Sequence, residues 1–544
     1  MQATMQATMQ PTLLIGLDGA TFTVLDDLMA KGLMPFLKSF TERGVKAGLN
    51  STPNPLTPPA WTTIMTGRTP GNHGIFDFIF AEQRKSDYYF TLSSFSDIKT
   101  ETIWSIVSRF EGSATTLNYP LMAPPPPING TVVPGLVSWR HLRRHVYPRE
   151  RFDELKTIPG FDPRELAWDF DMEKKAAQGI SETEYEAWAD FHISRERQWF
   201  NVTRYLMQNH PTDLMSILFD GPDKMMHMGW RFIDPDNFPE NPTPFDLKMR
   251  GLMQKYYIEL DGFLAELVEL AGPQTRVIMV SDHGFGPTWE VFRVNTWLAE
   301  QGYLTWRKFD DNMDEKDKAA FDKVKDKHFV LLDWDKTTAY ARSTTSNGIY
   351  IQVSYAPGEP GVPVEDYYDF REGIIEKLAT LVDPESGERI VKDVLRKEEF
   401  FPGDHGEQAP DLTLVMRDHS FVSILDKYPI VCPRPVIDGT HYPVGVFMAA
   451  GPGIKQGVAL PQLEIAQVAP AVLYSLGMDI PKNFESPVPT SVFEDNFVTE
   501  NPVRIGAATL PPKIALNQDG EVLRFEAEEE EQLMKQMQAL GYME

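Results

Sequence analysis

The sequence predicts a three-layer α/β sandwich, in which helices cover both faces of a central, mostly parallel sheet and a cap is inserted over one edge. Strand-like apolar runs alternate with helical segments, as in α/β proteins. The runs TLLIG, LMSILF and VIMVS are followed, at once or within a few residues, by Asp18, Asp223 and Asp282. Because the carboxyl ends of parallel strands converge on one crevice, we expect these aspartates to share a site.

The individual elements follow from hydrophobic spacing and from turn residues. A strand followed by a turn is predicted over 12–20 and over 276–284, a strand over 214–220, and a strand that ends in glycines over 444–453. Helices are predicted over 24–44, 58–67 and 175–208. The short helix has prolines in its first turn and ends at Gly67, so Thr57 is predicted to be its N-cap. The proline-rich stretch LMAPPPPINGTVVPG within 121–150 cannot form a regular element, and a basic stretch, WRHLRRHVYPR, follows it.

These elements predict a discontinuous core and two insertions. Residues 11–120, 205–300 and 435–500 are expected to form the catalytic α/β core, and 121–204 and 301–434 a cap over the active site. In the tail, 501–544, Leu533, Met537 and Leu540 share one face of an expected amphipathic helix.

Composition limits the classes of partner. The 544 residues carry a net charge of −26, which disfavours nucleic acid polymers and anionic membranes as partners. A small phosphorylated substrate would therefore need a local positive centre, which metal ions would supply. Cys432 is the single cysteine, so no internal disulfide is possible and a cytoplasmic location is expected. The chain shows neither a secretory signal nor an apolar run of membrane-spanning length, and its pattern leaves the oligomeric state open.

Six carboxylates and imidazoles have the spacing of metal ligands. Asp223 and His227 are four residues apart and would share one helix face, and Asp282 and His283 are adjacent in a turn after a strand. With Asp18 and His441, this set suits two divalent ions about 4 Å apart. Zinc is the first choice, with manganese or iron as alternatives.

Thr57 is the candidate nucleophile. A threonine hydroxyl needs activation, which metal coordination and a helix N-terminus would both provide. Taken one at a time, these residues have plainer interpretations, because an Asp after a strand often caps a turn and a Thr before a helix often serves only as an N-cap. The complete set, in one order, favours the two-metal hydrolase.

The same motifs carry a family resemblance. The chain resembles the alkaline phosphatase superfamily, nearest the type I phosphodiesterase/nucleotide pyrophosphatase branch and its subgroup of predicted phosphohydrolases or phosphomutases. The motifs are LDG at 17–19, TPPAWTTIMTGRTPGNHGI at 57–75, DGPDKMMH at 220–227, SDHGFG at 281–286 and GTHYPVGVFMAAGPG at 439–453. The resemblance implies one metal held by Asp223, His227 and His441. It implies a second held by Asp18, Thr57, Asp282 and His283.

The sequence also departs from the family pattern. The phosphodiesterase branch commonly has a phosphate-binding Asn three residues after the nucleophile, where this chain has Ala60. Asn347, Lys224 and Arg140 are the candidates to replace that contact, the last in a patch with Arg143 and Arg144. The sulfatase pattern is absent, because Thr57 cannot become formylglycine and the arginine of that motif is missing.

The predicted function is two-metal phosphoester hydrolysis with a threonine nucleophile, most simply on phosphodiesters or nucleotide pyrophosphates. The substrate would be a small phosphorylated molecule, and a nucleotide is one such molecule. The alternatives are a phosphomonoesterase or phosphomutase, then a phosphotransferase or sulfatase, and outside enzymes an inactive scaffold protein.

Overall fold

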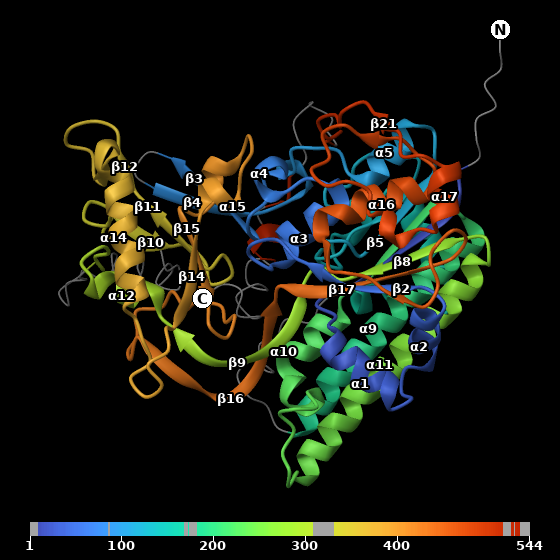
Figure 1. The fold of residues 1–544 in the computed structure, drawn as a ribbon, viewed down its shortest axis with the longest axis horizontal. Helices are drawn as coiled ribbons and strands as arrows, with labels where there is room; N and C mark the ends of the chain where they lie inside the picture. The colour runs from blue at the N-terminus through green and yellow to red at the C-terminus, as the bar shows by residue number, and fades with distance from the viewer. Residues whose placement is uncertain are drawn as a thin grey trace.

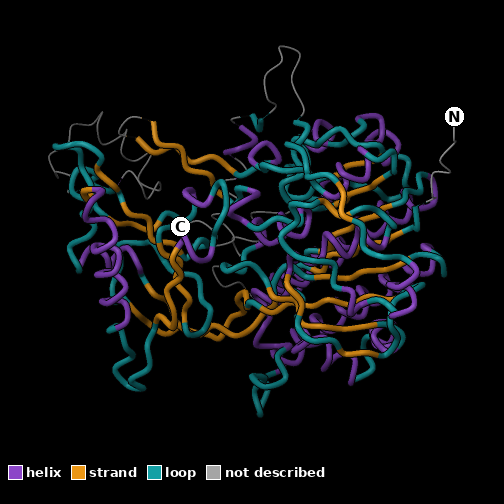
Figure 2. Tube along the Cα trace, turned by 45° about the horizontal axis from the view of Figure 1, so that its top comes forward, coloured by secondary structure: helices purple, strands orange, loops and turns teal. Residues whose placement is uncertain are grey.

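The computed structural model describes residues 9–84, 87–167, 172, 182–307, 331–514, 524–526, 528–531 and 533. These residues form two lobes joined by a long two-stranded ribbon, β9 (Gly284–Phe292) with β16 (Val431–Tyr442), visible at the bottom of Figure 1. The larger lobe holds the main sheet, and Figure 2 shows the strands of the two lobes as separate groups. The candidate ligands all lie in the larger lobe or at the start and end of the ribbon.

The main sheet has nine strands in the order β18-β2-β17-β8-β1-β7-β5-β6, with β19 also paired to β2. All pairings are parallel except those of β17, which runs antiparallel to both β2 and β8. The predicted mostly parallel sheet is therefore confirmed. Its strands are β1 (Thr12–Leu17), β2 (Val45–Asn50), β5 (Ala114–Leu117), β6 (Gly130–Val133), β7 (Leu214–Phe219), β8 (Arg276–Val280), β17 (Val444–Ala450), β18 (Val458–Ala459) and β19 (Leu463–Glu464).

Successive side chains of β1 point to opposite faces of the sheet, and each face is covered by one of the two expected layers of helices. Leu13, Ile15 and Leu17 face one hydrophobic cluster, whereas Leu14 faces the other. The first layer contains α1 (Phe22–Ala30), α2 (Pro35–Glu42), α9 (Glu182–Asn209), α10 (Gly221–Ile233) and α11 (Pro244–Ala271). The second contains α3 (Thr57–Thr66), α5 (Ile103–Arg109), α16 (Val468–Ser475) and α17 (Asp495–Glu500).

The smaller lobe has its own sheet and its own core. Its antiparallel sheet has the order β10-β11-β15-β14, and a separate hydrophobic cluster packs between that sheet and its helices. The elements are β10 (Ala339–Ala341), β11 (Gly348–Ile351), β14 (Val391–Arg396), β15 (Leu412–Met416), α12 (Val294–Glu300), α14 (Tyr367–Ala379) and α15 (Lys397–Phe400). Shorter pieces are β3 (Ile79–Arg84), β4 (Asp87–Leu92), β12 (Val353–Ser354), β13 (Val362–Pro363), β20 (Ile480–Pro481), β21 (Ile505–Gly506), α4 (Pro70–His73), α6 (Leu142–His145) and α7 (Arg149–Leu155).

Several boundaries differ from those expected from the sequence. The helix expected over 24–44 is two helices, α1 and α2, separated near Gly32, which has a φ of 71° that favours glycine. In the segment expected as part of the cap, 121–204, Gly130–Val133 instead pairs with β5 in the main sheet. The long α9 packs against α11 below that sheet, because its apolar face belongs to the first helical layer. The expected cap segment 301–434 forms most of the smaller lobe.

The described part of the tail lies against the larger lobe. Leu533 is buried beside Leu56 and Phe78, and the Glu530 carboxylate accepts a hydrogen bond from the Leu92 backbone N–H at 3.0 Å. Met537 and Leu540 lie outside the described residues. No helix among the described residues is long and apolar enough to cross a membrane.

Candidate metal centre and active site

The sheet topology explains why the strand-end aspartates meet. β1 lies between β7 and β8, and the register places Leu17 beside Phe219 and Gly16 beside Val280. The residues that follow these three parallel strands therefore emerge at one edge of the sheet. Because β17 is antiparallel, the ribbon strand β16 that precedes it reaches the same edge.

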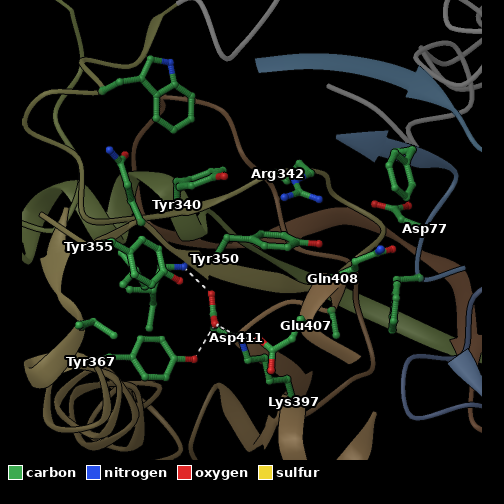
Figure 3. Close-up of a pocket in the computed structure, with 18 of the residues that line it drawn as sticks. Asp77, Tyr340, Arg342, Tyr350, Tyr355, Tyr367, Lys397, Glu407, Gln408 and Asp411 are labelled. Atoms are coloured by element: carbon green, nitrogen blue, oxygen red, sulfur yellow. Dashed lines mark hydrogen bonds and ion pairs between the residues drawn. The ribbon is translucent and has the colours of Figure 1, made fainter. Parts of the chain in front are cut away.

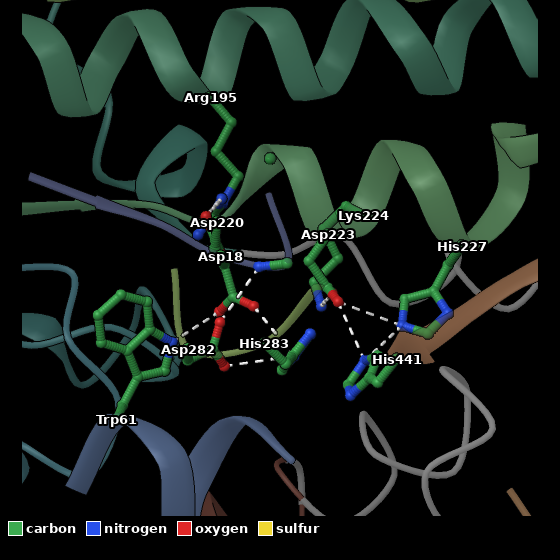
Figure 4. A network of polar contacts seen from close by, with 12 residues as sticks. Asp18, Trp61, Arg195, Asp220, Asp223, Lys224, His227, Asp282, His283 and His441 are labelled. Carbon is green, nitrogen blue, oxygen red and sulfur yellow. Dashed lines mark hydrogen bonds and ion pairs between the residues drawn. The ribbon is translucent and has the colours of Figure 1, made fainter. Parts of the chain in front are cut away.

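Asp223, His227 and His441 form the first group of candidate ligands (Figure 4). The Asp223 Oδ1 atom lies 3.3 Å from His227 Nε2 and 3.1 Å from His441 Nε2. The two Nε2 atoms are 3.0 Å apart. Asp223 and His227 share a face of α10, and His441 comes from β16 on the other side of the site.

Asp18, Asp282 and His283 form the second group. The His283 Nε2 atom lies 3.6 Å from Asp18 Oδ1 and 3.2 Å from Asp282 Oδ2. All three side chains are buried. His283 also lies close enough to Asp223 and His441 to join the first group, so it stands between the two.

Neighbouring groups fix these ligands in place. The Trp61 Nε1–H donates to Asp18 Oδ2 at 3.1 Å, and the Gly19 backbone N–H donates to Asp282 Oδ1 at 3.1 Å. Each carboxylate therefore has one oxygen occupied and one turned toward His283. Gly16 leaves room for this arrangement, because a Cβ there would lie 2.6 Å from the Trp61 ring.

Backbone carbonyl groups orient the imidazole rings of His283 and His441. The Nδ1 of His283 lies 3.0 Å from the Gly284 carbonyl oxygen, and the Nδ1 of His441 lies 2.9 Å from the Pro55 carbonyl oxygen. Such contacts place the proton on Nδ1 and leave Nε2 as the candidate ligand atom.

The charges and pKa shifts of the candidate ligands are those expected around a bound cation. Burial raises the pKa of Asp18 and Asp282 well above the usual range, and Asp223 raises both further. Burial would also raise the pKa of Asp223, but the Lys224 ammonium and the His227 imidazole hold it well below its usual range. Three buried atoms, Asp18 Oδ1, Asp282 Oδ2 and His283 Nε2, have no hydrogen-bond partner in the described part of the chain. Carboxylate oxygens and imidazole nitrogens in this arrangement are the donor set of zinc, manganese or iron.

Thr57 lies at the start of α3, beside the second group. It is the first helical residue, and the N-cap is Leu56, one residue earlier than the N-cap predicted from the sequence. Thr57 lines a small pocket with Asp18 and Lys224. Within the described residues its hydroxyl makes no hydrogen bond, which leaves the oxygen open to the pocket.

The same pocket includes two residues that the sequence analysis missed, Asn118 and Asp220. Asn118 follows β5 in the left-handed conformation, with a φ of 62°, and its Nδ2 donates to the Leu218 carbonyl and to Asp220 Oδ1. Asp220 forms a buried ion pair with Arg195 from α9. Asp220 directly follows the apolar run LMSILF, which is the signal that could have identified it. Asn118 follows ATTL, and neither it nor Arg195 gave such a signal.

Of the three candidates for a substrate contact, one lies in the pocket. The buried Lys224 ammonium is 2.8 Å from Asp223 Oδ2 and lines the pocket beside Thr57. Asn347 is instead part of the smaller lobe's framework, since its amide donates to the Ser420 carbonyl and accepts from the Val422 N–H. Its φ of 46° also suits a turn residue.

The basic patch is a surface feature. Arg140 is exposed and lies over the Trp139 ring, 5.6 Å from its centroid. Arg143 and Arg144 pair with Asp153 and Glu526. None of these arginines lines the pocket that contains Thr57, because that surface faces solvent.

His73 supports the helix that carries Thr57. The Ile75 N–H donates to its Nδ1 at 3.1 Å, so Nε2 carries the proton and donates to Thr63 Oγ1, also at 3.1 Å. The Thr63 hydroxyl donates in turn to the Pro59 carbonyl at 2.9 Å. Because the ring is buried, its pKa is lowered to about 3 and it stays neutral.

The mostly parallel α/β fold agrees with the class of protein that the sequence predicted, the alkaline phosphatase superfamily, and the sequence match to one of its families shows that class. Residues 12–441 match the type I phosphodiesterase / nucleotide pyrophosphatase family, and the chain belongs to that family. No curated protein matches the sequence.

Solved structures with a similar fold include two proteins of distant sequence. Murine ectonucleotide pyrophosphatase/phosphodiesterase 5, an inactive variant in complex with AMP, is 14% identical with a TM-score of 0.48, over 87% of this chain and 97% of that one. Phosphonoacetate hydrolase from Sinorhizobium meliloti, in complex with phosphonoacetate, is 16% identical with a TM-score of 0.47, over 86% and 95%.

Proposed function

We propose that this protein is a two-metal phosphoester hydrolase that uses Thr57 as its nucleophile and acts on phosphodiesters or nucleotide pyrophosphates. The observation that carries the proposal is the shared pocket of Thr57, Asp18 and Lys224. Asp18 belongs to the second ligand group, and Lys224 follows Asp223 of the first. A reacting phosphoryl group placed there would touch the nucleophile and both candidate ligand groups.

The ligands divide as the family resemblance implies. Asp223, His227 and His441 would hold one ion, and Asp18, Thr57, Asp282 and His283 the other, with zinc preferred over manganese or iron. When bound, the ions would lower the pKa values of the threonine hydroxyl and of a water molecule and would stabilise negative charge on phosphoryl oxygens.

Thr57 then carries the covalent steps. Its deprotonated oxygen attacks phosphorus in line, forms a phosphothreonine and expels the leaving-group oxygen with its bonding electron pair. The N-terminus of α3 favours the anionic oxygen, because the helix dipole is positive there. A water oxygen next attacks the same phosphorus and gives up a proton. The bond to Thr57 breaks, its electron pair returns to the threonine oxygen, and phosphate or a phosphomonoester is released.

In the phosphodiesterase branch an Asn commonly binds the phosphoryl group, and this chain has Ala60 at that position. We propose that Lys224 makes the phosphoryl contact instead. Its ammonium is buried in the pocket wall, where a charge-assisted hydrogen bond to a phosphoryl oxygen is strong. That fixed charge also favours a second candidate, a phosphomonoesterase or phosphomutase, since a monoester carries one more negative charge than a diester.

The two candidates differ in substrate preference. Turnover of bis-p-nitrophenyl phosphate should exceed that of p-nitrophenyl phosphate, measured as kcat/KM in the same buffer with added zinc or manganese. A strong preference for the monoester would replace the diesterase assignment with the second candidate. Absence of turnover on both compounds and on nucleotide pyrophosphates would reject the hydrolase proposal.

A further inference from the structure

A second and much larger cavity, of about 940 Å³, opens between the lobes (Figure 3). The smaller lobe contributes most of the wall, from Trp334 to Asp411. The larger lobe contributes Gly74, Phe76, Asp77, Ile79, Phe80 and Ser93. This volume is in the range of small-molecule binding sites.

The cavity is separate from the pocket that contains Thr57. Asp77 and Ile79 line the cavity, whereas Phe78 between them lines the pocket beside Thr57. Neighbouring side chains of this short segment thus line two different spaces. Asp77 is anchored on the cavity side, because the hydroxyls of Ser343 and Thr345 donate to its carboxylate.

Aromatic rings dominate the cavity wall. Eight of its twenty-six lining residues are Phe, Trp or Tyr. Tyr340 and Tyr350 are stacked with centroids 5.9 Å apart, and Figure 3 shows Tyr350 across the centre of the space. Tyr355 and Tyr368 are 78% and 62% exposed, so two large rings at the cavity leave most of their surface to solvent.

The charges of the wall disfavour anionic ligands, and one arginine stands where a cation would meet an aromatic ring. Six lining residues are acidic and two are basic, and Lys397 is already paired with Asp411 at 3.0 Å and with Glu407 at 3.2 Å. An anion such as a nucleotide would therefore meet repulsion. A cation would meet Arg342, whose guanidinium lies 3.7 Å from the Tyr350 ring centroid and has no carboxylate partner within ion-pair distance in the described chain.

Hydrogen-bonding capacity remains for a neutral ligand. Gln408 and Asp335 line the cavity and are exposed, so the wall offers an amide that can donate and accept hydrogen bonds and a carboxylate that can accept them. A sugar matches this combination, because its C–H faces pack on the negative faces of aromatic rings and its hydroxyls both donate and accept hydrogen bonds.

We propose that this cavity binds a neutral carbohydrate, a mono- or oligosaccharide, at a site distinct from the catalytic pocket. Tyr355 and Tyr368 would stack on the sugar rings, and Gln408 and Asp335 would bind sugar hydroxyls. The site would hold glycosylated material near the phosphoesterase centre or respond to free sugar.

The test uses the full-length, metal-loaded protein. It is screened on an array of neutral mono- to tetrasaccharides, and the strongest binder is titrated by calorimetry alongside AMP and choline chloride. We expect saturable binding of the sugar, at least a tenfold increase in its Kd in Tyr355→Ala/Tyr368→Ala, and no binding of choline to the cavity. Both substituted rings are exposed, so the variant should fold.

Phe110→Ala is the matched control, since Phe110 is also an exposed aromatic residue, 45% accessible, but does not line the cavity. It should leave the sugar's Kd unchanged. Turnover of bis-p-nitrophenyl phosphate without sugar should be the same in both variants as in the wild type. The proposal is overturned if no array sugar binds, if the double variant binds sugar normally, or if it loses basal turnover, which would make the cavity part of the catalytic pocket.

Discussion

The imidazole rings of His283 and His441 are stacked, with centroids 3.6 Å apart and planes inclined by 19°. One residue follows β8 and the other lies in β16, 158 positions later in the chain. Each ring contacts a backbone carbonyl through Nδ1, so both Nε2 atoms are available to the space between the ligand groups. This contact joins the two groups into a single site.

Thr57→Ala should abolish turnover while leaving metal content nearly unchanged. The substitution removes the nucleophilic oxygen but none of the six carboxylate and imidazole ligands, so a loss of about 10³-fold or more in kcat is expected. Activity and metal content per chain would be measured on the same preparation. Thr57→Ser is the matched control and should retain part of the rate; wild-type activity in Thr57→Ala would remove the nucleophile assignment.

Removal of metal with a chelator should inactivate the enzyme and lower its Tm. Bound ions stabilise the folded state by mass action and relieve the repulsion among buried carboxylates. Addition of zinc or manganese should restore both activity and Tm. A dialysed protein that holds no zinc, manganese or iron and still turns over substrate would contradict the two-metal proposal.

His283→Ala should cost more metal than His227→Ala. His283 stands close to both ligand groups, whereas His227 lies at the partly exposed edge of the first group, with 24% of its side chain accessible. We expect His227→Ala to retain about one ion per chain and His283→Ala to retain less. Equal stoichiometries in the two variants, determined by elemental analysis, would argue against the shared position of His283.

Trp61→Phe should weaken metal binding without unfolding the protein. The variant keeps an aromatic ring in the core but loses the 3.1 Å hydrogen bond to Asp18. Loss of a contact that orients a ligand typically costs about 10–100-fold in metal affinity. The dissociation constant for zinc would be measured by competition with a chromogenic chelator. Trp104→Phe is the control, because Trp104 is equally buried but donates to Ser216 instead.

His73 should make the protein acid-sensitive. Its folded pKa of about 3 lies below the unfolded value of 6.5, so below pH 6.5 the unfolded chain binds a proton that the folded chain does not. Its contribution to stability is therefore complete above pH 6.5 and declines as the pH falls toward 3, by about 2 kcal/mol at pH 5.

The measurement is urea unfolding at pH 7 and pH 5 with a chelator present, so that metal loss does not contribute. His73→Gln should be less stable than the wild type at pH 7, because it loses the contacts to Thr63 and Ile75. Its stability should then change less between the two pH values. An identical pH dependence in both proteins would show that His73 titrates normally in the folded state.

The sequence predicted the site residues that directly follow a strongly apolar run. Buried runs before Asp18 and Asp282 indicated parallel strands, and parallel strands must end at one edge, so the convergence of these residues could be predicted. Asn347 illustrates the limit of such reasoning. It lies among polar residues in a loop, but its amide is used by the backbone of the smaller lobe, a fact that depends on contacts 73 and 75 positions away.

The sequence by itself determined the α/β class, the family and the residue types available for chemistry, because these depend on hydrophobic period and on short motifs. Only the tertiary structure decided that Gly130–Val133 joins the main sheet, that Lys224 reaches the pocket of Thr57, and that an aromatic cavity forms between the lobes. These features come from pairing and packing between distant segments, and local periodicity does not encode which distant segments will meet.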